Sequence, residues 1–402
     1  MTTDRITSIR IAGMRAIENV EIPLNGLTVL IGDNGTGKST ILEAFEIMRQ
    51  AAKPVSFVTD ILERAHGGLA TLLRRGSHEI TLAVTLEGDG PGLMYSFSAA
   101  LIGAAAHIVE EHLDVEESGD APSPHFWRRG NDCKVVNAAG ELTEYSMNER
   151  VLGVTQLGVS ASESIKRLLA ALERIECHVP FETRPWWQQR ELEIRKGPRW
   201  SAYAEAASQL SLFGANLPNC FQEIRNAGNG VWNRVLDMAR LGLGEDLRDF
   251  RITTPRRGQL ELELVFGAFP DKPLPLDVLS EGQIVYLAFI ALSELNRQRS
   301  ALVFDEPELH LHPALLARVV GMLEDIAETS PVIVATHSDR LLDALSKPAE
   351  SVVLCELDEQ RSTQLLHPNA AQLSHWLEQY RGIGSLRAEG YEAHLFDRVS
   401  GG

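Results

Sequence analysis

Eight residues, Gly32 to Ser39 (GDNGTGKS), constrain this chain more than any other stretch of its sequence. They follow the pattern Gly, four residues, Gly, Lys, Ser or Thr, which is typical of a phosphate-binding loop. The apolar run LTVLI at 27–31 precedes the loop, and a segment with apolar residues at helical spacing follows it. A buried strand before the loop and a helix after it are the context that this motif requires. We therefore predict a nucleotide site here.

The glycines of this loop explain how it would bind phosphate. Because they tolerate positive φ and lack a Cβ, successive backbone N–H groups can curl around phosphate oxygens. The helix that follows adds the partial positive charge of its N-terminus. We expect Lys38 to reach the β- and γ-phosphates of ATP and Ser39 to coordinate Mg²⁺. The predicted ATP-binding residues of this segment are Gly32, Asn34, Gly35, Gly37, Lys38, Ser39 and Thr40.

Composition limits the kind of protein that carries this loop. The chain has 402 residues, 44% of them hydrophobic and 23% charged, which is usual for a globular protein larger than one average domain. Its net charge of −17 argues against coating nucleic acid through bulk positive potential, so any DNA contact needs a local patch or a partner. Four widely spaced cysteines and an N-terminus without an apolar core predict a cytoplasmic protein with no membrane association.

The remaining pattern changes along the chain. Residues 5–12 and 19–24 predict two strands joined by a turn, and short alternating runs over 79–145 predict antiparallel strands. Ser160 and Glu163 predict a capping box, followed by Ile165, Leu168, Leu172 and Ile175 at helical spacing. From 275 onward helices (281–296, 313–328, 338–346) alternate with apolar strands (301–304, 331–336, 351–357). That alternation predicts a parallel sheet with helices on both faces.

The segment ALVFDE (301–306) supplies carboxylates where a nucleotide site needs them. Its apolar residues predict a buried strand, so Asp305 emerges at the carboxyl edge of the sheet, where ligands bind in open parallel sheets. We expect Asp305 to hold Mg²⁺ through water and Glu306 to act as general base on the attacking water. Taken alone, two surface carboxylates after a strand are commonplace. Downstream of a phosphate loop, the catalytic interpretation is favoured.

Two further motifs, LSEGQ (279–283) and ATHS (335–338), follow the same logic. LSEGQ opens a helix, and the backbone N–H groups at Ser280, Gly282 and Gln283 suit a γ-phosphate, although taken alone an ordinary Ser N-cap is the better explanation. His337 follows a strand and is predicted to reach the γ-phosphate and the attacking water. A lone histidine there is more often structural, so the other motifs decide the interpretation.

These four elements, in this order, resemble the ATP-binding-cassette ATPases, in particular their SMC, RecF and overcoming-lysogenization-defect (OLD) branch. Residues 8–45 and DEPELHLHP (305–313) carry the resemblance, which is strong over about 1–50 and 275–345. It implies an α/β fold: a P-loop NTPase, ABC-type ATPase head with an antiparallel β-subdomain and an inserted helical subdomain. The implied parts are an N-terminal head segment (1–178), a mainly helical insertion (179–274), a C-terminal head segment (275–365) and a tail (366–402).

The resemblance also implies a homodimer, or a higher homo-oligomer, in which two subunits enclose two ATP molecules. The phosphate loop of one subunit would face Ser280 and Gly282 of the other, and hydrolysis would open the dimer. Three features depart from the family pattern. Glu281 stands where transporters have Gly; no aromatic residue precedes the loop to stack on adenine, so Met14 or Arg15 would substitute; and the glutamine that senses Mg²⁺ is assigned to Gln156.

Other chemically suggestive residues have two interpretations. Glu308, His310 and His312 suggest a metal site, but the resemblance favours an interface loop. The segment 184–200 mixes basic residues with tryptophans, a combination that suits a surface that binds nucleic acid or a partner. A packed helical lobe with a solvated basic edge is nevertheless favoured. Arg256 and Arg257 carry the same ambiguity. The tail residues His375, Trp376 and Tyr380 are typical of helix packing.

Three hypotheses remain for what hydrolysis drives. The first is a DNA-linked or anti-phage ATPase; OLD relatives carry a fused TOPRIM nuclease, and the sequence ends too soon after ATHS for one, so the effector would be a separate protein. The second is a transporter subunit, against which the 240 positions between Ser39 and Leu279 argue. The third is a binding module that uses ATP only to dimerise, against which Glu306 argues, because such a module needs no base.

Overall fold

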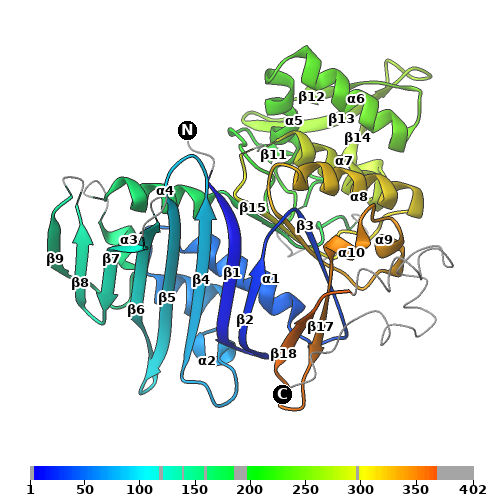
Figure 1. The fold of residues 1–402 in the computed structure, drawn as a ribbon. Coiled ribbons are helices and arrows are strands. Elements are labelled where there is room, and N and C mark those ends of the chain that lie inside the picture. The colour runs from blue at the N-terminus through cyan, green and yellow to red at the C-terminus, as the bar shows by residue number, and fades with distance from the viewer. Residues whose placement is uncertain are drawn as a thin grey trace.

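The computed structural model describes residues 4–116, 121–137, 140–157, 161–184, 197–295 and 298–368 (Figure 1). One of its two large sheets has eight antiparallel strands in the order β2-β1-β4-β5-β6-β7-β8-β9. These strands are β1 (Arg5–Met14), β2 (Ile17–Pro23), β4 (Glu79–Glu87), β5 (Gly92–Ile102), β6 (Ala105–Glu116), β7 (Ser123–Arg129), β8 (Asp132–Val136) and β9 (Leu142–Ser146). Alternate side chains of β4 are buried, as the period-two pattern predicts. The predicted antiparallel subdomain is confirmed.

The second sheet has six strands in the order β10-β15-β16-β3-β17-β18. They are β10 (Ile175–His178), β15 (Ala301–Asp305), β16 (Val332–Ala335), β3 (Leu27–Ile31), β17 (Val352–Leu357) and β18 (Thr363–Leu366). Neighbouring strands run parallel except β17 and β18, which form an antiparallel hairpin. The predicted parallel sheet is therefore confirmed, with β3 near its centre.

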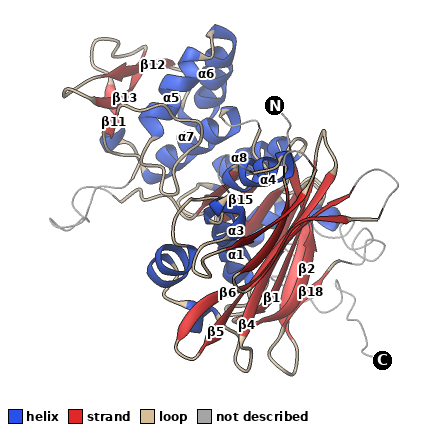
Figure 2. Ribbon diagram, turned by 90° about the vertical axis from the view of Figure 1, so that its left-hand side faces the viewer, coloured by secondary structure: helices blue, strands red, loops and turns tan. Residues whose placement is uncertain are grey.

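Helices cover both faces of the six-stranded sheet. Successive residues of β16 point into different cores: Ile333 and Ala335 join the core around α1 (Lys38–Gln50) and α4 (Glu163–Glu173). Val332 and Val334 join the core around α7 (Glu281–Glu294), α8 (Pro313–Ala327) and α9 (Asp339–Asp343). The first core also includes the inner face of the eight-stranded sheet, so α1 lies between the two sheets (Figures 1 and 2). Burial on both faces explains the almost wholly apolar strands.

An inserted lobe lies on the α7 side of the molecule (Figure 2). It contains α5 (Leu217–Asn226), α6 (Asn229–Leu243), β11 (Ala202–Tyr203), β12 (Leu247–Thr253), β13 (Gln259–Phe266) and β14 (Leu274–Pro275). The helical character of this insertion agrees with the sequence pattern, whereas the strand β12 was not predicted. A register shift between Leu247 and Asp249 explains the omission, because the buried Leu247 and Phe250 are then three residues apart instead of two.

Smaller elements complete the described chain. They are the π-helix η1 (Phe57–Ala65), α2 (Leu69–Leu72), α3 (Gly153–Gln156), the 3₁₀-helix η4 (Leu276–Val278) and α10 (Pro348–Ser351). The capping-box prediction for α4 needs correction: the N-cap is Ser162, without a side-chain cap bond, and Ile175 belongs to β10. Ser160, most of the segment 184–200, and His375, Trp376 and Tyr380 lie outside the described residues. None of the helices in the described ranges has the length and apolar character that crossing a bilayer requires.

A buried ion pair connects the edge strand β10 to the end of α7. Arg299 Nε donates to Glu176 Oε2 at 2.9 Å, and its NH2 group donates to the carbonyls of Leu292 and Leu295 near the end of α7. Burial alone would raise the pKa of Glu176, but the charge of Arg299 and the hydrogen bond from His178 lower that pKa to about 2. The pair therefore makes stability depend on pH.

Replacing Glu176 with Gln tests this coupling. Removing one partner leaves Arg299 charged and buried, so the free energy of unfolding at pH 7 should fall by about 3–5 kcal/mol. Because the folded pKa lies below the usual value of 4.5, the carboxylate stabilises the fold above pH 4.5 and loses this effect as the pH falls toward 2. Urea titrations should thus show the difference between wild type and Glu176→Gln shrinking below pH 4.5. A constant difference, or an equal effect of Glu245→Gln at an exposed position, would contradict the assignment.

Candidate functional site

The phosphate loop connects β3 to α1, as predicted, and its glycines have positive φ: 136° at Gly32, 81° at Gly35 and 105° at Gly37. A Cβ on Gly32 would lie 2.1 Å from the carbonyl oxygen of Cys355 in β17, so no other residue fits there. At Gly35, by contrast, a Cβ would meet open space. The loop is thus packed against the sheet at its start and open at its tip.

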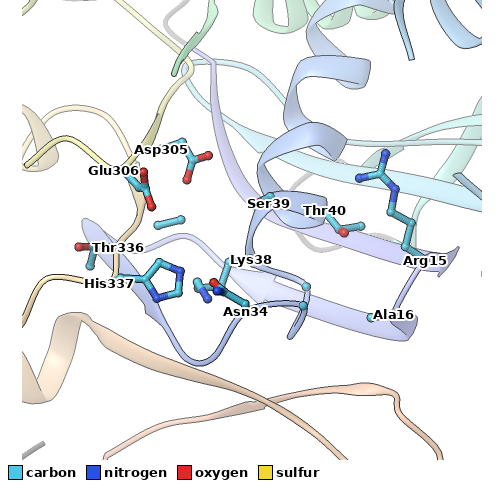
Figure 3. A pocket seen from close by; sticks show the side chains of 13 residues that line it. Arg15, Ala16, Asn34, Lys38, Ser39, Thr40, Asp305, Glu306, Thr336 and His337 are labelled. Atoms are coloured by element: carbon cyan, nitrogen blue, oxygen red, sulfur yellow. The ribbon is translucent and has the colours of Figure 1, made fainter. Parts of the chain in front are cut away.

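A cavity of about 530 Å³ lies over this loop (Figure 3). It is lined by Arg15, Ala16, Asn34, Gly35, Gly37, Lys38, Ser39, Thr40, Asp305, Glu306, Ala335, Thr336 and His337. The lining comes from the carboxyl ends of β15 and β16, the β1–β2 turn, and the loop and first turn of α1. The structure therefore brings together most of the residues that the sequence analysis assigned to the nucleotide. Gly32 lines a neighbouring cavity of about 420 Å³ beside β17.

Lys38 points toward the start of the loop. Its Nζ donates hydrogen bonds to the carbonyl oxygens of Gly32 at 2.6 Å and Asp33 at 2.9 Å, and the side chain is buried. An ammonium group at this position is ready to exchange carbonyl oxygens for phosphate oxygens, which carry more negative charge. ATP thus fits a site that has a cation, open backbone N–H groups and a helix N-terminus.

Asp305 and Glu306 lie at the same end of the cavity as His337, while Arg15 lies at the other end (Figure 3). Burial raises the pKa of Asp305, the charge of Glu306 raises it further, and Lys38 opposes both effects. Glu306 has a φ of 46°, which is rare outside glycine, and strain of this kind is concentrated at functional sites. Asp305 and the exposed Ser39 offer the oxygen ligands that Mg²⁺ prefers.

Thr336 lines the cavity and Glu308 is hydrogen-bonded to this threonine, although no role in the nucleotide site was predicted for either residue. The Thr336 hydroxyl donates to Glu308 Oε1 at 2.5 Å and accepts from the backbone N–H of Ser338 at 2.9 Å. Burial raises the pKa of Glu308, with the bond from Thr336 opposing it. The loop after β15 is thus fixed to the loop that carries His337. Glu308 lies close to the ATHS motif because β15 pairs with β16, and this pairing cannot be read from the sequence.

The histidines of the Glu308–His312 loop have other partners. His310 Nδ1 lies 2.6 Å from Glu281 Oε2, and His312 Nδ1 accepts from the backbone N–H of Ala314 as the N-cap of α8. Within the described ranges, no group of three or more His, Cys, Asp or Glu side chains is arranged to hold a metal ion. The metal hypothesis for Glu308, His310 and His312 is therefore wrong.

Two candidates for the adenine contact are now separated. Met14 is fully buried and cannot reach a base, so that alternative is wrong. Arg15 lines the cavity, and its NH1 group lies 2.6 Å from Glu43 Oε2 of α1. Its guanidinium is therefore held at the end of the cavity away from Asp305 and Glu306 (Figure 3). That a guanidinium stacks on adenine stays a prediction.

Gln156 does not reach the cavity. Its side chain donates to the carbonyls of Asn148 and Val151 and accepts from the backbone N–H of Asn148, so it stabilises a local turn beside α3. The cavity lining does not include it. The assignment of Gln156 as a Mg²⁺ ligand is therefore wrong, because short-range backbone groups already satisfy its amide.

The LSEGQ motif begins α7, as expected. Ser280 and Gln283 form a capping box: Ser280 Oγ accepts from the Gln283 N–H at 3.3 Å, and Gln283 Oε1 accepts from the Ser280 N–H at 3.0 Å. Ser280 is exposed. None of Ser280, Gly282 and Gln283 lines the cavity of the same chain. A Cβ on Gly282 would lie 2.6 Å from the His310 carbonyl oxygen, so this turn packs closely against the Glu308–His312 loop.

Comparisons with known proteins agree with this geometry. A family model for an AAA ATPase domain matches residues 5–183, and one described as "AAA domain, putative AbiEii toxin, Type IV TA system" matches residues 240–343. An SMC head solved with the C-terminal winged-helix domain of ScpA aligns with a TM-score of 0.51 and 13% identity, over 90% of this chain and 97% of that one. The protein has the fold of an SMC/OLD-like ABC-type ATPase head. The predicted fold class is confirmed.

Two curated proteins that are similar to this chain are OLD nucleases. The one from Thermus scotoductus is 22% identical over 83% of this chain, and the one from Escherichia phage P2 is 23% identical over 88% of it. The aligned region spans 59% and 60% of the length of these two relatives. An ATPase-type function is supported by the relatives together with the AAA match.

Lys38→Ala tests the site directly. Loss of charge-assisted hydrogen bonds to phosphate should weaken ATP binding by about ten- to a hundredfold, since each is worth about 1.5–3 kcal/mol. Titration with a fluorescent ATP analogue measures the dissociation constant. The exposed Lys53, just after α1, provides the matched control, and Lys53→Ala should bind as wild type does. Equal affinity of all three proteins would refute the site.

Proposed function

We propose that this protein hydrolyses ATP with Mg²⁺, in a dimer that encloses two nucleotides between two copies of the chain. The observation that carries the proposal is a single cavity lined by the phosphate loop, two carboxylates at the end of β15 and His337. The ammonium group of Lys38 suits a polyphosphate, and the carboxylates of Asp305 and Glu306 suit the divalent metal bound to it.

The cavity suggests a role for each residue. Lys38 and the loop N–H groups would bind the β- and γ-phosphates, and Arg15 would lie beside the base. Ser39 and Asp305 would hold Mg²⁺, which neutralises charge that develops on the phosphate oxygens. Glu306 would accept a proton from the attacking water, and His337 would stabilise the γ-phosphate.

The position of LSEGQ supports the dimer. Ser280 is exposed and does not line the cavity of its own chain, yet it begins a helix whose N-terminus suits an anion. A second copy would bring this helix over the open tip of the phosphate loop at Gly35. Each nucleotide would then have ligands from both chains, so that ATP binding and assembly are linked.

We further propose that the ATP cycle drives a DNA-related or anti-phage action through a separate protein effector. The OLD relatives are named nucleases, and the aligned SMC head was solved with a domain of a partner protein. The net charge of −17 favours DNA contact through a partner or a local patch over contact along the whole surface.

Glu306→Gln tests the catalytic assignment. Without a general base, ATP turnover should fall by about a hundredfold or more, while ATP affinity changes little. The variant should accumulate as an ATP-bound dimer, seen as doubled mass in light scattering with ATP and Mg²⁺, with and without duplex DNA. Unchanged turnover would refute Glu306 as the base. A wild type that binds ATP and dimerises without turnover would instead favour the ATP-binding module.

Mixing two inactive variants tests the composite site. Lys38→Ala disables the phosphate loop, and Ser280→Arg blocks the motif that would face it. In a mixed dimer one site carries both changes and the other carries neither. If assembly is random and the two sites work independently, about half of the dimers are mixed and each has one intact site. Activity should then reappear at roughly a quarter of the wild-type rate. Two sites that each use one chain only would show no recovery on mixing.

A further inference from the structure

The β17–β18 hairpin (352–366) lies directly beside the nucleotide cavity. Its strand β18 lies next to β2 at the edge of the eight-stranded sheet, while β17 pairs with β3, which leads into the phosphate loop (Figure 1). The hairpin therefore contacts both segments that would hold ATP: the phosphate loop and the β1–β2 turn. None of its residues lines the main cavity.

Thr363, the first residue of β18, joins these two segments. Its hydroxyl donates to the carbonyl oxygen of Thr36 in the phosphate loop at 2.9 Å, and its backbone N–H donates to the carbonyl oxygen of Ala16 at 2.9 Å. Thr363 is 1% exposed, so both bonds are shielded from water. Ala16 lines the cavity, as does Gly37, which follows Thr36.

The fit against Gly37 is tight. A Cβ on Gly37 would lie 2.5 Å from Thr363 Oγ1, and the φ of 105° at Gly37 already excludes most other residues. Gly37 is the N-cap of α1, so its conformation decides where the helix N-terminus and the Lys38 backbone point. The Thr363 side chain thus contacts the loop at the residue where loop becomes helix.

Arg74 also links the β1–β2 turn to the β17–β18 hairpin. Its NH1 group donates to the carbonyls of Ala16 at 2.9 Å and Arg361 at 3.1 Å, and its NH2 group donates to the carbonyl of Gln360 at 3.2 Å. The backbone around Arg74 pairs with the turn itself, because the Arg15 N–H donates to Leu72 and the Arg74 N–H donates to Gly13. Arg15 has a φ of 47°, so this turn needs external support.

We propose that the β17–β18 hairpin is the positioning element of the nucleotide site, and that Thr363 is its positioning residue. Thr363 holds the phosphate loop and the β1–β2 turn at a fixed separation, so that loop N–H groups and Arg15 engage the two ends of one ATP. The inference rests on the proposed function, because ATP is the ligand. A movement of the hairpin changes ATP affinity before it changes the chemical step.

The geometry predicts which kinetic constant depends on Thr363. The hydroxyl does not face Asp305, Glu306 or the end of the cavity where the γ-phosphate would react, so kcat should be unaffected. Losing the bond to Thr36 leaves a carbonyl unpaired and frees the loop to move. Binding must then order the loop again, which weakens affinity without altering the reaction.

Thr363→Val keeps shape and strand preference and removes only the hydroxyl. It should raise the ATP dissociation constant and KM about five- to tenfold, as the loss of one buried hydrogen bond implies, with kcat within about twofold of wild type. Thr363→Ser restores the donor and should restore affinity. Thr143→Val is the matched control, because Thr143 lies in β9 at the edge of the eight-stranded sheet that is far from β2, and its hydroxyl also donates to a carbonyl, that of Val135 at 3.2 Å.

The outcomes separate the two proposals. If wild type neither binds nor hydrolyses ATP, the proposed function fails and the inference fails with it. The inference alone is overturned if wild type binds ATP, Thr363→Val binds it equally well, and thermal unfolding measurements show that the variant is folded. Arg74→Met gives a second test through different atoms: it too should raise KM with kcat retained, and a loss of kcat alone in both variants would also overturn the positioning role.

Discussion

The structure depends on β3, a five-residue strand buried on both faces. Its alternate side chains enter two different cores, one shared with α1 and the eight-stranded sheet and the other shared with α7 and α8. Because β3 lies between β16 and β17, its carboxyl end and that of β16 meet at one edge. The phosphate loop begins there, and Gly32 packs against β17 so closely that no side chain fits. The site follows from this sheet order.

The loop after β15 connects the parts of the site that lie on different elements. Glu308 accepts from Thr336, which supports the segment carrying His337. Two residues later His310 contacts Glu281, and its carbonyl packs against Gly282. The end of β15, the end of β16 and the start of α7 are therefore linked within nine residues of chain, from Asp305 to Pro313. A change at the carboxylates would reach the surface where a second copy is proposed to bind.

Patterns local in sequence were predicted well. The phosphate loop between strand and helix, the carboxylates after an apolar strand, and the Ser280 cap each depend on a few consecutive residues, and the structure has all three. Errors arose where a motif does not fix the direction of a side chain or the partners of its polar atoms. Gln156 is in a plausible motif, but backbone groups of the 148–151 turn occupy its amide. Met14 is the last residue of β1 and its side chain is fully buried in the core, whereas Arg15 is the first residue of the turn that follows.

The sequence by itself determined the chemistry: a glycine-rich loop with a lysine, carboxylates after a buried strand and a histidine after another are sufficient to indicate a nucleotide site, because each motif fixes its own backbone. Only the tertiary structure decided which residues support that site. Thr363 lies 327 positions from Thr36, and Arg74 lies 58 from Ala16. Such contacts depend on strand order and on the packing of two sheets around α1. These are properties of the whole chain, which no local pattern of residues specifies.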